Sequence, residues 1–123
     1  MEQKVCLDTD VVIAILNNEE RAIKIIEKIE NSLVFITTVT LFELLLRKTN
    51  LQAIEIFRNK VYMLGFNEDA ARKASDIFKE LQMKGRMTDI RDIFIASICI
   101  ANNCSLSTFN KKHFEHINEI NLI

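Results

Sequence analysis

The stretch KVCLDTDVVI, residues 4–13, decides how the start of this chain folds. Residues 4–7 form a short, β-prone apolar run that stops abruptly at the polar residues 8–10, and a second apolar run follows as far as Leu16. This pattern predicts a buried strand, a tight turn and a helix whose N-terminus is capped from the Asp-Thr-Asp segment. Asp8 is therefore expected directly after the carboxyl end of a strand.

The rest of the chain alternates between helical and extended patterns. Helices are expected over residues 19–30, 40–48, 51–59, 67–85 and 89–102, extended segments over 34–37, 60–66, 104–108 and 120–123, and a helical turn at 113–114. Asn67 is expected to cap one of these helices, and Gly85 to end it in a left-handed conformation. The alternation predicts an α/β protein, an α/β/α sandwich with a short, mainly parallel central sheet. Ligands of such sheets bind beyond the carboxyl ends of the strands.

The composition is that of a globular protein. With 123 residues, of which 49% are hydrophobic and 27% charged, the chain is expected to form a single domain over residues 1–123. No apolar run approaches the ~20 residues that cross a bilayer, and no secretory leader opens the chain, so no membrane contact is expected. The three cysteines cannot all pair and form no Cys-x-x-Cys motif, which favours a reducing compartment, the cytoplasm.

The net charge of −1 limits how the protein could bind nucleic acid. Proteins that rely on bulk attraction to phosphate are usually much more basic. Any contact with nucleic acid must therefore be local or must work through a metal ion.

Acidic residues far apart in the sequence are expected to meet at the carboxyl edge of the sheet. Asp8 follows the first strand, Glu43 lies near the start of the helix after the second, Asp92 lies in the first turn of a later helix, and Asn110 follows the strand after that helix. Crowded carboxylates repel one another unless a cation lies between them. Oxygen ligands without a Cys/His set suit Mg²⁺ or Mn²⁺ better than zinc.

Each of these acids also has an ordinary structural interpretation. Asp8 or Asp10 could simply cap the first helix. Thr40 and Glu43 have the spacing of a capping box, in which Glu43 would only reach back to a backbone N–H. Asp92, like Asp89, is a reasonable first-turn acid, favoured by the helix dipole.

Taken together, four segments resemble a known family. They are LDTDVVI (residues 7–13), TVTLFEL (38–44), GRMTDIRDIFIA (85–96) and LSTFNKKHF (106–114). In this order and over nearly the full length, the chain resembles the PIN-domain family, most closely the small VapC-type toxins of prokaryotic toxin–antitoxin pairs. The resemblance implies a metal-dependent ribonuclease that hydrolyses RNA phosphodiester bonds and uses Mg²⁺ or Mn²⁺, with Asp8, Glu43 and Asp92 as the catalytic and metal-binding acids.

The fourth position of the family pattern is often Asp but is Asn110 here. An asparagine can still offer a carbonyl oxygen or bind a metal-bound water, but it removes one negative charge. Asp10 and Asp89 are nearby acids that could compensate. Candidates for contacts to the RNA backbone are Arg47, Lys48, Arg86, Arg91, Lys111 and Lys112, each of which could equally be an ordinary solvated charge. His113 is expected to pack or hydrogen-bond within its turn rather than to act as a general base.

The resemblance also implies partners, namely a cognate antitoxin and a second copy of the chain. The helix around residues 41–46 is apolar almost all round and needs burial on more than one side. A dimer interface, an antitoxin groove or deep burial in the monomer could each supply this.

Two other functions fit parts of the same sequence. Asp8-Thr9-Asp10-Val11-Val12 also matches the signature of haloacid-dehalogenase-type phosphatases, in which Asp8 would be the nucleophile and Asp10 the general acid/base. Alternatively, Asn110 could mark a catalytically inert PIN-like module that binds RNA or protein without cutting.

Overall fold

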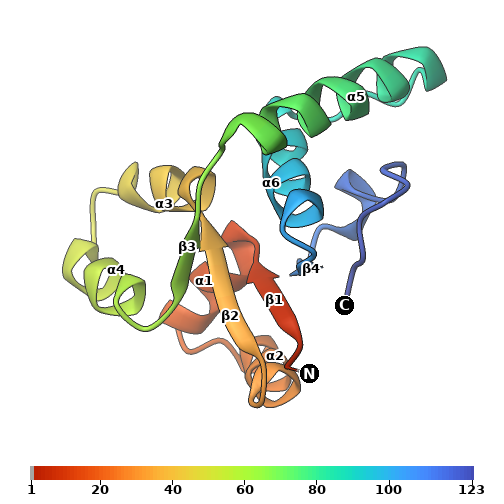
Figure 1. Ribbon diagram of the computed structural model, residues 1–123. Coiled ribbons are helices and arrows are strands. Elements are labelled where there is room, and N and C mark those ends of the chain that lie inside the picture. Colours follow the sequence, from red (N-terminus) through yellow and green to blue (C-terminus); the bar gives the residue numbers. More distant parts are fainter. Residues whose placement is uncertain (1) are drawn as a thin grey trace.

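The computed structural model describes residues 2–123 and contains four parallel strands in the order β3-β2-β1-β4 (Figure 1). The elements are β1 Lys4–Leu7, α1 Thr9–Leu16, α2 Glu20–Ile29, β2 Leu33–Thr37, α3 Thr38–Leu45, α4 Leu51–Arg58, β3 Tyr62–Leu64, α5 Glu68–Lys84, α6 Ile90–Ala101, β4 Ser105–Ser107 and the 3₁₀ turn η1 Lys111–His113. Within the described residues, no helix is both long and apolar enough to span a membrane.

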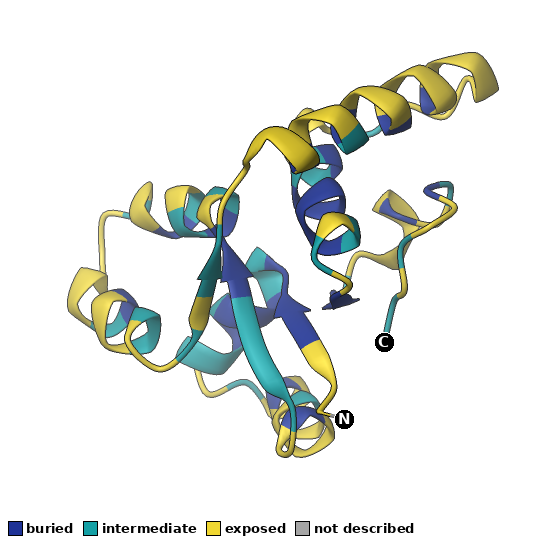
Figure 2. Cartoon of the chain, in the orientation of Figure 1, coloured by how far each residue is buried: buried dark blue, intermediate teal, exposed yellow. Residues whose placement is uncertain are grey.

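The sheet separates two apolar cores, as expected from the alternation of side chains along a strand. Val5 and Leu7 of β1 pack with helices α1–α4, whereas Cys6 between them packs with α5, α6 and the segment after β4. On β2, Ile36 packs in the core of helices α1–α4, and Phe35 packs against the core of α5 and α6. Most of β1, all of β4 and the inner faces of α1 and α6 are accordingly buried, whereas β2 is only partly buried, the edge strand β3 has no buried residue, and the outer faces of α2 and α5 are exposed (Figure 2). The predicted α/β/α sandwich is confirmed.

Helix ends follow the local signals in most places. Asp8 caps α1, Asn67 caps α5 through its side-chain oxygen, and Asp89 caps α6. Gly85 ends α5 with φ 65°, a conformation that glycine adopts without the strain of a Cβ.

Some predicted boundaries are wrong. Helix α3 begins at Thr38 rather than residue 40, because the Thr37 hydroxyl accepts the Thr40 N–H and caps the helix earlier, and it ends at Leu45 rather than 48. Strands β3 and β4 are shorter than the extended segments predicted at 60–66 and 104–108, and the helical turn lies at Lys111–His113 rather than at 113–114. The segment 120–123 is not a regular strand but makes a single parallel bridge between Leu122 and Leu106.

The apolar helix α3 is only partly covered within the chain. Leu44 is 1% exposed and belongs to the core, but Phe42, Leu45 and Leu46 are 53%, 45% and 59% exposed. Deep burial in the monomer therefore does not account for the apolar residues on its outer side.

Candidate active site

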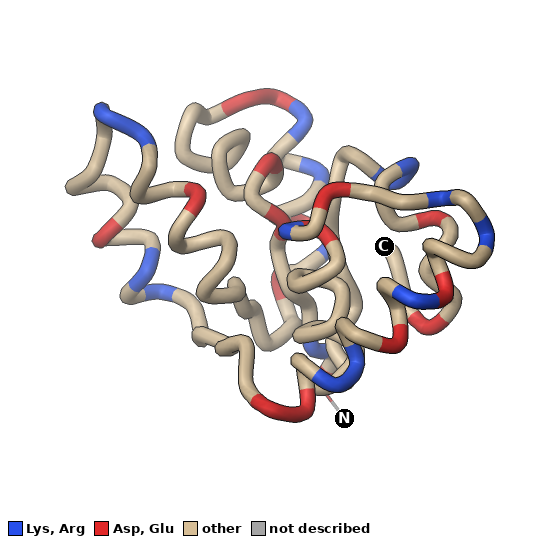
Figure 3. The backbone as a smooth tube through the Cα atoms, turned by 90° about the horizontal axis from the view of Figure 1, so that it is seen from above, with Lys and Arg blue, Asp and Glu red and all other residues tan. Residues whose placement is uncertain are grey.

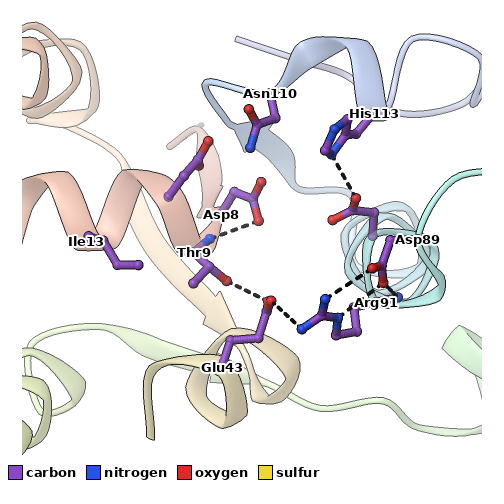
Figure 4. A pocket seen from close by; sticks show the side chains of 10 residues that line it. Asp8, Thr9, Ile13, Glu43, Asp89, Arg91, Asn110 and His113 are labelled. Atoms are coloured by element: carbon purple, nitrogen blue, oxygen red, sulfur yellow. Dashed lines mark hydrogen bonds and ion pairs between the residues drawn. The ribbon is translucent and has the colours of Figure 1, made fainter. Parts of the chain in front are cut away.

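A cavity of about 290 Å³ opens at the carboxyl edge of the sheet, where the ends of β1 and β4 meet the starts of α1 and α6 (Figure 4). Its lining consists of Asp8, Thr9, Asp10, Ile13, Glu43, Asp89, Arg91, Asp92, Asn110 and His113. All six residues proposed from the sequence as acids or metal ligands are therefore brought to one place. Figure 3, which looks onto this edge, shows several acidic stretches gathered near the middle of the view, with basic stretches beside them.

Asp8 lies deepest among these acids and is 6% exposed. One of its oxygens accepts the Thr9 N–H at 2.9 Å, and the other accepts the Thr108 hydroxyl at 2.7 Å. Burial raises the pKa of Asp8 to about 6, and the negative charges of Asp10 and Asp92 add to the rise, although the two hydrogen bonds oppose it. Asp8 is thus both the helix cap and a fixed, crowded carboxylate.

Glu43 reaches the cavity from α3. The Thr9 hydroxyl donates to Glu43 Oε1 at 2.8 Å and also lies 3.1 Å from the Thr40 hydroxyl. The other oxygen of Glu43 lies 3.4 Å from Arg91 Nη1. The capping-box interpretation of Thr40 and Glu43 is therefore wrong, because Thr40 lies inside the helix and the Glu43 side chain turns toward α1 and α6.

Arg91 neutralises two of the acids rather than standing free for a ligand. Its Nε and Nη2 lie 3.2 and 3.1 Å from the two oxygens of Asp89, and its backbone N–H donates to Asp89 at 2.8 Å. Hydrogen bonds from Arg91 lower the pKa of Asp89. The guanidinium thus connects Asp89 with Glu43 across the mouth of the cavity (Figure 4).

Asp92 is paired with His113, whose Nδ1 lies 3.1 Å from Asp92 Oδ2. Burial raises the pKa of Asp92, while His113 acts in the opposite direction. His113 does form a hydrogen bond, but not within its own turn as predicted, because its partner Asp92 lies on α6 and both side chains line the cavity. Its neighbours in sequence, Lys111, Lys112 and Phe114, give no indication of a partner 21 residues away.

Asp10 and Asn110 lie on the remaining side of the cavity. Asp10 Oδ2 accepts the Phe109 N–H at 3.1 Å, which ties the first turn of α1 to the loop that carries Asn110. Asp10 Oδ1 is buried, and among residues 2–123 it finds no hydrogen-bond partner. Burial raises the pKa of Asp10. A buried carboxylate oxygen without a partner is costly unless a cation or water reaches it.

The other basic residues proposed from the sequence lie apart from the acids. Arg86 and Lys112 line a neighbouring cavity of about 320 Å³ that shares His113 with the first. Lys111 and Lys112 flank a further hollow beside Phe109 and Asn110. Arg47 and Lys48 follow the end of α3, outside the residues that line the acidic cavity.

The donors in this cavity are mostly hard oxygen atoms, the kind preferred by Mg²⁺ and Mn²⁺. In the arrangement seen for residues 2–123, however, no three His, Cys, Asp or Glu side chains already converge on one point as a complete metal site. The ion pair of Arg91 and the contact of His113 hold two of the carboxylates in other directions. Metal binding here would need Arg91 and His113 to release these two carboxylates.

Comparison with known proteins gives a consistent result. A family profile described as "PIN domain" matches residues 5–120. Ribonuclease VapC1 of Methanocaldococcus jannaschii is 28% identical over 121 residues, which cover 98% of this chain and 86% of that protein.

Among solved structures, VapBC2 from Rickettsia felis bound to a promoter DNA fragment matches with a TM-score of 0.87 and 25% identity, covering 98% of both chains. DNA-bound VapBC from Salmonella typhimurium matches with a TM-score of 0.86 and 26% identity, covering 98% of this chain and 97% of that one. The range matched by the family profile includes every residue that lines the acidic cavity.

Proposed function

Because the chain belongs to the PIN-domain family, we propose that it is a divalent-metal-dependent ribonuclease and the toxin of a VapBC-type toxin–antitoxin pair. The observation that carries the proposal is the convergence of Asp8, Glu43, Asp92 and Asn110 from four elements on one cavity. The curated relative is named a ribonuclease, and the similar solved structures are named as VapBC complexes.

The residues present fit a Mg²⁺ or Mn²⁺ ion. Asp8 and Asp92 carry pKa values raised by burial, and Asp10 has a buried oxygen with no partner in the described chain, so the metal-free cavity holds more crowded negative charge than its neighbours neutralise. Asp8, Asp92 and Glu43 would hold the metal, and Asp10 or Asn110 would complete its surroundings. Asp89 is the weaker candidate because Arg91 contacts both of its oxygens.

When bound, the metal would lower the pKa of a water molecule and neutralise charge that develops on the phosphate. The chain's own residues do the positioning. Thr108 and the Thr9 N–H fix the Asp8 carboxylate, and the Thr9 hydroxyl fixes Glu43, so both acids are oriented before substrate arrives. Arg91 would turn from Glu43 toward the RNA phosphate once the acids have a metal to bind.

The partner proposals follow from the family and from the surface. The exposed residues Phe42, Leu45 and Leu46 form an apolar face on α3, and either a second copy of the chain or the antitoxin would cover it. The three cysteines are free in the structure, which agrees with a cytoplasmic location.

The phosphatase hypothesis and the inert binding module are not equally supported. The phosphatase hypothesis needs Asp10 as a general acid/base, but Asp10 Oδ2 is engaged by the Phe109 N–H, and the family match favours nuclease chemistry. The inert binding module remains the second candidate, because Asn110 replaces a carboxylate.

The test is cleavage of end-labelled structured RNAs by the purified protein in Mg²⁺, in Mn²⁺ and in EDTA. Asp8→Asn and Glu43→Gln, checked for folding by circular dichroism, are expected to lose metal-dependent cutting. Glu27→Gln, an exposed acid on α2, is the matched control and should cut like the wild type. Equal activity in all four proteins, or activity that persists in EDTA, would contradict the proposal, and RNA binding without cutting would favour the inert module.

A further inference from the structure

A second cavity of about 320 Å³ adjoins the acidic one and shares His113 as a common wall. It lies between the loop that joins α5 to α6 and the turn that follows β4. Its size is at the lower end of the range typical for small-ligand sites. The residues that decide its chemistry are Leu81, Arg86, Met87, Thr88, Lys112 and His116.

The cations of this second cavity are free to bind a ligand. Arg86 and Lys112 are exposed, and neither side chain has a hydrogen bond or ion pair with any residue in 2–123. One acid, Glu115, also lines the cavity, and its Oε1 lies 3.5 Å from His116 Nε2. Arg91 is different from these two cations, because it is already paired with Asp89 and Glu43. The two cations outnumber the acid, so the second cavity carries a net positive charge beside the cavity lined by several acids.

The same cavity also has an apolar part. Leu81 is buried at its base, and Met87, 47% exposed, stands at its edge. A polar hydroxyl is available from Thr88. Cations for a phosphate together with an apolar surface for a ribose or base are the combination that single-stranded nucleic acid uses.

We propose that this second cavity is a subsite for the RNA nucleotide next to the cleaved bond, with Arg86 and Lys112 binding its phosphate and Met87 contacting its sugar or base. The proposal rests on the ribonuclease function proposed above. A linear ligand fits better than a separate small anion, because the two cavities meet at His113 and a chain can continue from one into the other. The subsite also explains how a protein of net charge −1 can hold RNA locally.

The experiment measures binding without cutting. A short single-stranded RNA of mixed sequence, labelled with fluorescein, is titrated with the full-length protein in EDTA, and fluorescence anisotropy gives Kd at several salt concentrations. Wild type is compared with Arg86→Gln, Lys112→Gln and the control Lys24→Gln, an exposed lysine on α2, at the opposite end of the strands (Figure 1). Circular dichroism checks that each variant is folded.

Each cavity variant should lower the slope of log Kd against log salt by about 0.7 and weaken binding about fivefold at 0.1 M salt, because one phosphate contact is lost. Lys24→Gln should leave both unchanged. Slopes that do not change in Arg86→Gln and Lys112→Gln, an equal loss in Lys24→Gln, or no binding by wild type would overturn the subsite. Metal-dependent cutting that still requires Asp8 would show that the proposed function survives such a failure.

Discussion

Replacing Asp8 with asparagine should stabilise the metal-free protein while abolishing its metal response. An aspartate normally titrates near pH 3.9, whereas burial raises the pKa of Asp8 to about 6. Folding therefore disfavours the ionised form, and the loss of stability grows as pH rises from about 4 to about 6. At pH 7 the ionised carboxylate costs about 3 kcal/mol.

Asparagine removes that cost but cannot accept from both the Thr9 N–H and the Thr108 hydroxyl, which offsets about 1 kcal/mol. The net gain of about 2 kcal/mol corresponds to a melting temperature roughly 8 °C higher in a chain of this size. At pH 4 the carboxyl is almost fully protonated in the folded protein and about half protonated in the unfolded chain, so the cost of its charge falls below about 1 kcal/mol and the advantage should disappear.

Urea unfolding at pH 7 in EDTA, repeated at pH 4 and in Mn²⁺, measures each part of this prediction. At a Mn²⁺ concentration 100 times its Kd, wild type should gain about 2.7 kcal/mol, and Asp8→Asn should gain little. Glu27→Gln on α2 is the control and should follow wild type throughout. An Asp8→Asn protein less stable than wild type at pH 7 in EDTA would refute the reasoning, because burial of the charge would then not be a cost.

Three other changes test the packing and the hydrogen bonds of the site. Arg91→Gln removes the cation that holds Glu43, so calorimetric titration should show severalfold tighter Mn²⁺ binding. Unchanged affinity would mean that this ion pair does not compete with metal. The Thr9→Val protein should cut RNA roughly tenfold to a hundredfold more slowly, because Glu43 loses the hydrogen bond that fixes its orientation. The Thr9→Ser protein keeps the hydroxyl and should retain most of the rate. In urea unfolding, Leu44→Ala should lower the free energy of unfolding by about 2–5 kcal/mol, whereas Leu46→Ala, at an exposed position, should lower it by no more than about 0.5 kcal/mol. Losses of equal size in the two variants would show that α3 packs differently.

Much of the fold could be predicted because its signals are local. The apolar run of β1 ends at Asp8, the Asn67 side chain caps α5, and Gly85 alone supplies the left-handed end of that helix. Each of these features depends on a few neighbouring residues, so the local sequence is enough to predict it. The strand predicted at 120–123 failed because only Leu122 lies in register with its neighbour, and register depends on the whole segment before it.

The site could be predicted only in part. The carboxyl ends of parallel strands meet at one edge, which placed Asp8 and Asn110 correctly without any knowledge of contacts. The ion pair between Arg91 and Glu43 and the contact between His113 and Asp92 join segments with no sequence pattern in common. They also depend on side-chain rotamers, so a pattern of charges along the chain could not reveal that Arg91 faces acids rather than RNA.

The hydrogen bond between Asp8 and Thr108 spans 100 residues and bears on how the protein is made. The next contact, from the Asp8 N–H to the Ser107 carbonyl, spans almost as many residues, because the first strand, β1, pairs with the last strand, β4, at one edge of the sheet. During synthesis β1 leaves the ribosome first and must wait for the segment after α6 before its carboxyl end is fixed. An unfinished chain therefore has the acids of α1 and α3 but no closed cavity, and we expect a chain released early from the ribosome to lack the proposed nuclease activity.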